Sequence, residues 1–197
     1  TKATTYDNNT KPASNTFLPG VYCGGLTVNN TTGITFTMNP GVYVMAGGGF
    51  TLQSNAVVTG TGVTIYNTSA ANVASAGGPS CAGSPSFSPM NINGQAIATL
   101  TAPTTGSLAG ILFFEDRSLG SASTQNQIVG SSTVVMNGAL YFKNSELLYS
   151  GNGSATGYTM LVADKIVING NSATTIYLNN SPLSGSGTAR AIPLLGQ

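Results

Sequence analysis

The sequence predicts an all-β protein, specifically a single-domain right-handed parallel β-helix (β-solenoid) with one long loop tied down by a disulfide. The first observation behind this prediction is a repeat, because the motif Pro-Gly-Val-Tyr at 19–22 recurs at 40–43 and each copy opens a β-rich run. The period of about 21 residues lies within the range of solenoid repeats. The second observation is that apolar residues come in short alternating runs, which are typical of strands.

The composition excludes several classes of protein. Only 6% of the 197 residues are charged, whereas ordinary domains have ~25%. The longest apolar run, at 109–114, is far shorter than the ~20 residues that a membrane-spanning helix needs. Six Lys and Arg are scattered along a chain of net charge +1, so it has no basic stripe for nucleic acid. We therefore expect no membrane span, no nucleic-acid partner, and a surface made polar by Thr, Ser and Asn.

The two cysteines, Cys23 and Cys81, are expected to form a disulfide. A zinc site is excluded because the chain has no CxxC motif and no histidine, and the same lack of histidine leaves a cysteine nucleophile without its usual base. The disulfide contributes roughly 4 kcal/mol in the chain-entropy model. It also predicts an oxidising compartment, extracellular or at the cell surface. Because the chain starts with Thr and shows no signal peptide, we expect a processed or excised exported domain, and we expect no cofactor.

The first part of the chain is predicted to contain two complete repeats and the start of a third. Residues 1–18 are polar and unpatterned, and they are expected to cover the first exposed strand. Glycines at 24–25 and 47–49 mark corners where the backbone needs unusual dihedral angles. The expected strands of this part lie at 21–23, 26–28, 34–38, 42–45, 50–52, 56–59 and 61–66.

Residues 70–91 lose the strand period and are predicted to form a long loop extruded from the solenoid, carrying Cys81. This loop is also the expected variable contact region. Residues 181–197 are rich in Gly and Ser and are predicted to be a C-terminal tail or cap. Between them the strand pattern resumes, at 96–101, 109–114, 128–130, 133–136, 138–142, 147–151, 158–162 and 165–170.

The one cluster of charged residues is Glu115, Asp116 and Arg117, directly after an apolar strand. A carbohydrate-active enzyme built on a β-helix would use such carboxylates with an Arg or Lys base, and this is one hypothesis for the function. Neighbours in a strand point to opposite faces, however, so Glu115 and Asp116 do not pair by default. The simpler interpretation is a turn held by local hydrogen bonds, with no catalytic residue and no metal ligand. Glu146 and Asp164 are the remaining acids that later strands could bring toward this cluster.

Threonine spacing gives another hypothesis. Thr-x-Thr triplets occur at 35–37, 59–61 and 99–101, and a flat face of ranked Thr would fit an ice-binding protein. The later strands lose the triplets, and outward Thr is also simply a favourable strand residue.

Several motifs in order resemble the C-terminal region of bacterial TadG-like proteins, which accompany tight-adherence (Flp-type) pilus assembly. The resemblance covers roughly residues 17–175 and implies a cell-envelope protein linked to pili and adhesion, without established catalytic residues. The family usually has an N-terminal membrane anchor, and we expect that residues 1–197 do not include it. A shorter stretch, residues 19–28 and 40–52, is similar to ice-binding adhesin domains. The motifs that carry the longer resemblance are PGVYCGGL at 19–26, PGVY at 40–43, GTGVTIY at 60–66, LTAPT at 100–104, AGILFFEDR at 109–117, NGALYF at 137–142 and LVAD at 161–164.

Together these observations predict a non-enzymatic structural or adhesive protein of the bacterial surface, linked to pili. Its partners would be pilus or envelope proteins, a surface or a glycan, with end-to-end self-association as a further possibility. The carbohydrate-active enzyme centred on Glu115, Asp116 and Arg117 and the ice-binding domain remain the alternatives.

Overall fold

The structure is a computed structural model that describes residues 2–7, 9, 12, 14–29, 31–130, 134–151 and 159–169. Within these residues the chain is built almost entirely of parallel β-strands, with one short helix. The elements are β1 (Lys2–Tyr6), β2 (Thr16–Phe17), β3 (Gly20–Asn29), β4 (Thr35–Met38), β5 (Gly41–Ala46), β6 (Phe50–Gln53), β7 (Val57–Thr61), β8 (Val63–Thr68), α1 (Ala70–Ser75), β9 (Asn91–Ile92), β10 (Ile97–Thr101), β11 (Ile111–Glu115), β12 (Gln125–Gly130), β13 (Val134–Gly151) and β14 (Thr159–Asn169).

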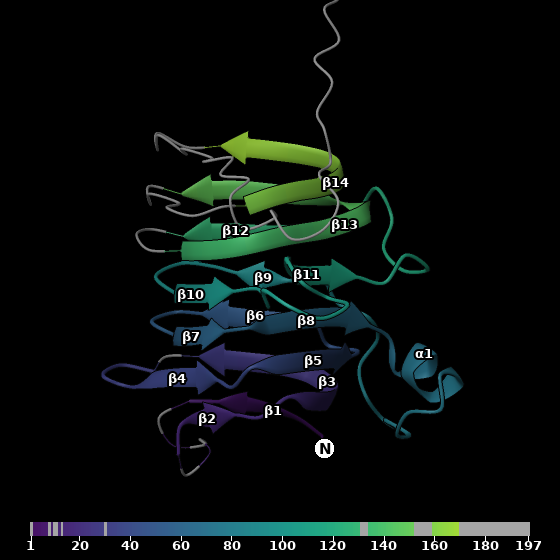
Figure 1. The fold of residues 1–197 in the computed structure, drawn as a ribbon, viewed down its shortest axis with the longest axis horizontal. Helices are drawn as coiled ribbons and strands as arrows, with labels where there is room; N and C mark the ends of the chain where they lie inside the picture. Colours follow the sequence, from purple (N-terminus) through teal and green to yellow (C-terminus); the bar gives the residue numbers. More distant parts are fainter. Residues whose placement is uncertain are drawn as a thin grey trace, which may run out of the picture.

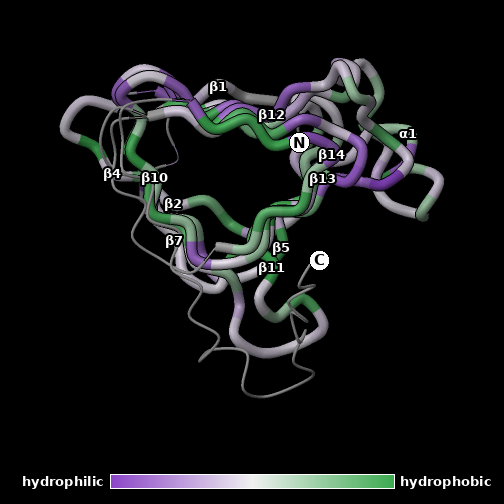
Figure 2. The backbone as a smooth tube through the Cα atoms, turned by 90° about the horizontal axis from the view of Figure 1, so that it is seen from above, coloured by the Kyte–Doolittle hydropathy of each residue, from purple (hydrophilic) through white to green (hydrophobic). Residues whose placement is uncertain are grey.

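The strands are stacked in layers, so that strands about one repeat apart in sequence lie side by side (Figure 1). Seen from above, the layers superpose around a common outline in which hydrophobic stretches recur from layer to layer (Figure 2). The repeat predicts this stacking, because equivalent strands of successive repeats can pair in parallel and in register.

The sheet closes on itself, and this overturns the predicted β-solenoid. Hydrogen-bonded pairs run β3–β5–β8–β11–β13–β12–β9–β6 and back to β3, which makes a closed eight-strand parallel barrel, with the remaining strands added to it. Closure depends on two long strands. β3 pairs with β5 through its first half and with β6 through its second half, and β13 pairs with both β11 and β12. The ladder therefore continues around each corner.

The repeated Pro-Gly-Val-Tyr motifs make equivalent contacts in the two copies. The hydroxyl of Tyr22 donates to the carbonyl of Leu18 at 2.7 Å, and that of Tyr43 donates to the carbonyl of Asn39 at 2.8 Å, again four residues earlier. Tyr43 is fully buried, and the carbonyl of Phe17 also lies 2.8 Å from its hydroxyl, so the two carbonyls share its one donor hydrogen. A buried tyrosine hydroxyl needs such partners, so each motif fixes the turn before its strand.

Glycine is required where two corners pack against each other. Gly25 and Gly48 have φ of +81° and +71°, in the left-handed region that suits glycine. A Cβ on Gly48 would overlap the backbone of Gly24 in the neighbouring layer, and a Cβ on Gly25 would overlap Gly49. The predicted role of 24–25 and 47–49 as corners matches this geometry.

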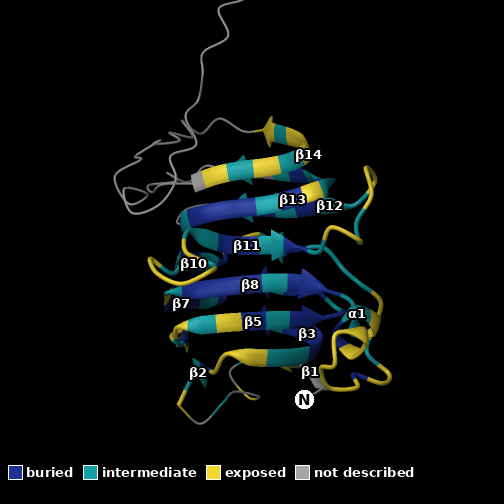
Figure 3. Cartoon of the chain, turned by 45° about the vertical axis from the view of Figure 1, so that its right-hand side comes forward, coloured by how far each residue is buried: buried dark blue, intermediate teal, exposed yellow. Residues whose placement is uncertain are grey.

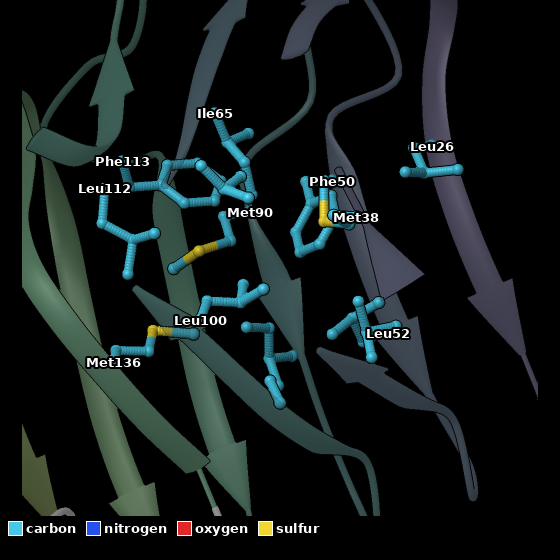
Figure 4. Close-up of a cluster of buried hydrophobic side chains, with 14 of the residues drawn as sticks. Leu26, Met38, Phe50, Leu52, Ile65, Met90, Leu100, Leu112, Phe113 and Met136 are labelled. Atoms are coloured by element: carbon cyan, nitrogen blue, oxygen red, sulfur yellow. The ribbon is translucent and has the colours of Figure 1, made fainter. Parts of the chain in front are cut away.

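A continuous hydrophobic core runs through the stacked layers (Figure 4), and it is formed by the barrel strands together with β2, β4, β7 and β10. Phe17 stacks on Phe36 with ring centroids 5.1 Å apart, and Phe50 meets Phe113 edge to face at 5.9 Å. Burial is greatest in the middle strands such as β8, whereas β14 is more exposed (Figure 3). Short alternating runs are therefore sufficient to form a core when every inward position points into one interior.

The disulfide between Cys23 and Cys81 is present, as predicted. It ties the segment between β8 and β9 to β3, and the two cysteines pack with Ala46 and Val73 in a small second cluster. This segment also contains α1, capped by Ser69, whose hydroxyl accepts from the backbone N–H of Asn72. Six residues are too few for a helical period to show in the sequence.

Residues 1–18, predicted to be an unpatterned cover, contain β1, which pairs with β3, and β2, which pairs with β4. The predicted tail or cap at 181–197 lies outside the described residues. In the part of the chain that is described, no helix has the length and hydrophobicity to cross a membrane.

Candidate functional site

The charged cluster lies at the end of β11, and its two carboxyl groups point to opposite sides of the strand. Glu115 is 1% exposed and faces the interior, whereas Asp116 is half-buried and lies on the outer side. This is the alternation expected of neighbouring strand residues. The two acids consequently do not form a facing pair.

Glu115 is held by two side chains that donate to its carboxylate. The Ser145 hydroxyl donates to Oε1 at 2.5 Å and the Asn126 amide donates to Oε2 at 2.9 Å. Burial raises the pKa of Glu115 above its usual range, and the neighbouring Asp116 charge adds to this, although both hydrogen bonds act in the opposite direction. Met90 completes the arrangement, since its backbone N–H donates to Asn126 Oδ1. Both carboxylate oxygens of Glu115 therefore accept a hydrogen bond from within the protein, and so does the amide oxygen of Asn126.

Asp116 ties the outer side of β8 to α1. Its Oδ2 accepts from Tyr66, Thr68 and Asn72 at 2.7–2.9 Å, and its Oδ1 accepts from the backbone and hydroxyl of Ser118. Partial burial alone would raise the pKa of Asp116, but these hydrogen bonds outweigh it and hold the pKa well below the usual range. Asp116 is therefore a charged anchor between the barrel and α1.

Arg117 lies over two aromatic rings on the outer surface. Its guanidinium carbon is 5.7 Å from the ring centre of Phe114 and 5.2 Å from that of Tyr141. These distances are typical of cation–π contacts. The backbone of Arg117 is held by Asn144, whose amide donates to its carbonyl at 2.6 Å.

The later acids do not join this cluster. Glu146 accepts from Lys165 at 2.7 Å and from Gln125 at 2.6 Å, and the hydrogen bond from Lys165 is the main reason that its pKa is lowered. Asp164 is exposed on β14. Among the described residues no three metal-ligating side chains gather into a group that could hold an ion. Asp116 accepts a local hydrogen bond from Ser118, as a turn would supply, but the other partners of the two acids are distant in sequence, and the two carboxyl groups do not face each other.

A different surface carries ordered hydroxyl groups. On the sheet formed by β2, β4, β7, β10 and the start of β13, Thr16, Thr37, Thr59 and Thr99 occupy successive in-register positions. We call this surface the threonine face. The residue that precedes each threonine in its strand, such as Phe36, Val58 or Ala98, is buried. The column ends at Val135, which pairs with Thr99.

Two shorter columns lie beside this one. Thr61 pairs with Thr101 on one side, and Thr35, Val57 and Ile97 are in register on the other. Strands lie about 4.8 Å apart and alternate residues about 6.6 Å apart along a strand, so the side chains form a two-dimensional lattice. All three Thr-x-Thr triplets noted in the sequence contribute to it.

The sequence pointed to some of these residues and missed others. The triplets were visible because alternation places both threonines on one side of a strand. Thr16 was missed because it lies in a segment without a pattern, and Asn126 and Ser145 were missed because single polar residues within strands give no signal of burial. Tyr66, Phe114 and Tyr141 carry a strand signal, but only the register of three strands separated in sequence brings them together.

The chain matches no protein-family model, no curated protein and no solved structure. The resemblance to TadG-like proteins consequently stays a prediction.

Proposed function

We propose that this chain is a non-enzymatic, exported structural or binding module of the bacterial surface, and that it contacts its target through the threonine face. The observation that carries the proposal is the in-register lattice of Thr37, Thr59 and Thr99 with its flanking columns. Threonine presents a hydroxyl and a methyl group on a stiff side chain, so a lattice of threonines offers hydrogen bonds and apolar contacts at fixed spacing.

Two further observations support this proposal. The Cys23–Cys81 disulfide is consistent with an oxidising, extracellular compartment. The buried Glu115 and the fully hydrogen-bonded Asp116 favour a structural role for the charged cluster over catalysis. The resemblance to TadG-like proteins would place the target among envelope partners, surfaces or glycans.

A surface of equally spaced groups suits a solid, periodic target, and adsorption tests this. The protein is mixed with microcrystalline cellulose, chitin or purified peptidoglycan, and the bound fraction is measured. The variant T59K places a charged side chain in the centre of the threonine face. We expect wild-type protein to adsorb to at least one solid and T59K to lose most of that adsorption.

The matched control is T51K. Thr51 is also a central, outward threonine, but it lies on β6, between Thr27 and Asn91 of the neighbouring strands. T51K should adsorb like the wild type. Absence of adsorption to all the solids, or equal loss in T59K and T51K, would contradict the proposal. Release of new sugar ends from any polysaccharide would contradict its non-enzymatic part.

The same lattice favours ice as a second candidate target, because a rigid array of hydroxyl and methyl groups can order water on a repeating lattice. Inhibition of ice recrystallisation measures this directly. Inhibition that is present in the wild type and in T51K but lost in T59K would support ice binding. Growth of ice crystals at the rate of a buffer control would exclude ice and leave the solid-glycan target unaffected.

A further inference from the structure

A second outward surface has a different chemistry. Val44, Tyr66, Phe114, Tyr141 and Val162 occupy in-register positions on β5, β8, β11, β13 and β14. The rings of Tyr66 and Phe114 have centres 5.8 Å apart, and Phe114 and Tyr141 stack at 4.9 Å with nearly parallel planes. We call these three rings the aromatic stripe. The aromatic stripe lies on β8, β11 and β13, whereas the centre of the threonine face is formed by β4, β7 and β10.

Arg117 is positioned on the aromatic stripe in advance of any ligand. The turn after β11 is closed by a hydrogen bond from the backbone N–H of Leu119 to the carbonyl of Asp116, and Asn144 of β13 donates to the carbonyls of Arg117 and Leu119. The guanidinium then rests on Phe114 and Tyr141. A side chain held in this way loses little conformational freedom when it binds.

The charge of Arg117 is not neutralised by a neighbouring acid. Asp116 is next to it in sequence, but its carboxylate accepts hydrogen bonds from Tyr66, Thr68, Asn72 and Ser118 on the α1 side. In the described part of the chain, the one ion pair joins Lys165 to Glu146. Arg117 is exposed, so its guanidinium donors remain accessible to a ligand.

Lys143 adds a second positive charge to the same surface. It follows Tyr141 by two residues on β13, and the intervening Phe142 is buried, so Lys143 and Tyr141 point outward together. The exposed Asp164 on β14 makes no ion pair with Lys143. Two cations beside stacked rings fit a ligand that has both carboxylates and apolar C–H surfaces.

We propose that Arg117 and the aromatic stripe bind an acidic polysaccharide with uronate units. The guanidinium of Arg117 would form a two-pronged hydrogen bond with a carboxylate, the geometry for which arginine is preferred over lysine. The partly exposed rings of Phe114 and Tyr141 would contact the C–H groups of the sugar, and Lys143 would attract the next carboxylate along the polysaccharide. This site is independent of the threonine face.

The test is isothermal titration of the intact protein with polygalacturonate oligomers. The matched ligand is the same oligomer with its carboxyl groups methyl-esterified. We expect binding of the acidic oligomer that weakens as salt is raised, and little binding of the ester. R117Q should weaken the affinity at least about tenfold, and R117K should weaken it less, because lysine keeps the charge but not the two-pronged geometry.

K165Q is the matched control, because it removes one exposed positive charge from β14 outside the stripe. It should bind like the wild type, as should T59K. The proposal is overturned if the wild type does not bind the acidic oligomer, if the ester binds equally well, or if K165Q loses as much affinity as R117Q. Thermal unfolding of each variant shows that it is folded. Loss of adsorption in T59K has no bearing on this result, so the two proposals can fail separately.

Discussion

Glu115 and Asp116 are adjacent in the chain and opposite in environment. Glu115 faces the interior and is held by Asn126 and Ser145, which come from β12 and β13. Asp116 faces outward and binds β8 and α1. The comparison shows that one step along a strand decides whether a carboxyl group completes the core or fastens an external segment.

The pKa values of Glu115 and Asp116 are shifted in opposite directions because the two carboxyl groups lie on opposite sides of the strand. Burial dominates at Glu115 and raises its pKa. At Asp116 the hydrogen bonds from Thr68, Ser118 and Asn72 exceed the effect of burial and lower the pKa.

Removing the inner carboxyl should cost the most stability. E115A leaves the Asn126 amide and the Ser145 hydroxyl without their buried partner and creates a cavity, so we expect a loss of about 3 kcal/mol in the free energy of unfolding. E115Q keeps the volume and can still pair with both groups, and it should lose much less. Urea unfolding measures both. Equal losses in E115A and E115Q would show that the hydrogen bonds to Glu115 are not what matters.

Crowding the inner site should have the next largest effect. Gly120 has φ of +75°, and a Cβ there would overlap the Ser145 hydroxyl and Glu115 Oε1. G120A should therefore lose about 2 kcal/mol more than G94A, since Gly94 has a similar φ of +66° but open space around it. Thermal unfolding compares the two. A similar loss of stability in G120A and G94A would show that backbone strain alone, without the overlap at Ser145 and Glu115, causes the loss.

Removing the outer carboxyl should loosen one segment more than the whole protein. D116A deletes the acceptor for Thr68 and Asn72, so we expect a loss of about 1.5 kcal/mol and faster amide exchange in α1. D164A removes an exposed acid and should change neither quantity. Hydrogen exchange followed by mass spectrometry reports α1 separately. Unchanged exchange in α1 of D116A would mean that Cys81 alone holds this segment.

The smallest effect is on pH dependence. A lowered pKa means that Asp116 stabilises the fold above its unfolded value of about 4 and that this contribution is lost as the pH falls toward the folded value. A raised pKa means that Glu115 favours the fold most below its unfolded value of about 4.3 and less as the pH rises through the folded value. D116N should reduce the loss of stability that occurs as the pH falls toward the folded pKa of Asp116. E115Q should remove the loss of stability that occurs as the pH rises through the folded pKa of Glu115. Urea unfolding at a series of pH values tests this, and a wild-type slope in either variant would contradict the corresponding assignment.

Local features of this protein could be predicted from its sequence, but closure of the sheet could not. The repeat at 19–22 and 40–43 predicts parallel stacking, and the Cys23–Cys81 disulfide follows from the absence of other cysteines. The solenoid prediction is wrong because nothing in the period states whether β3 and β13 bend and carry the ladder around a corner. For the same reason, the sequence predicts the alternation at Glu115 and Asp116 but not their partners, which come from strands and loops up to 50 residues away.

Closure of the barrel also has a consequence for how the protein is made. The ring β3–β5–β8–β11–β13–β12–β9–β6 has two links through β13, the next to last described strand. Until β13 has been synthesised, the edges of β11 and β12 that it pairs with have no partner, and such edges attract other chains. Most pairings join strands from different repeats, which favours slow folding. Completion of one late strand is thus the step that turns an aggregation-prone chain into a closed one, and substitutions in β13 should affect the yield of folded protein more than equivalent substitutions in β5.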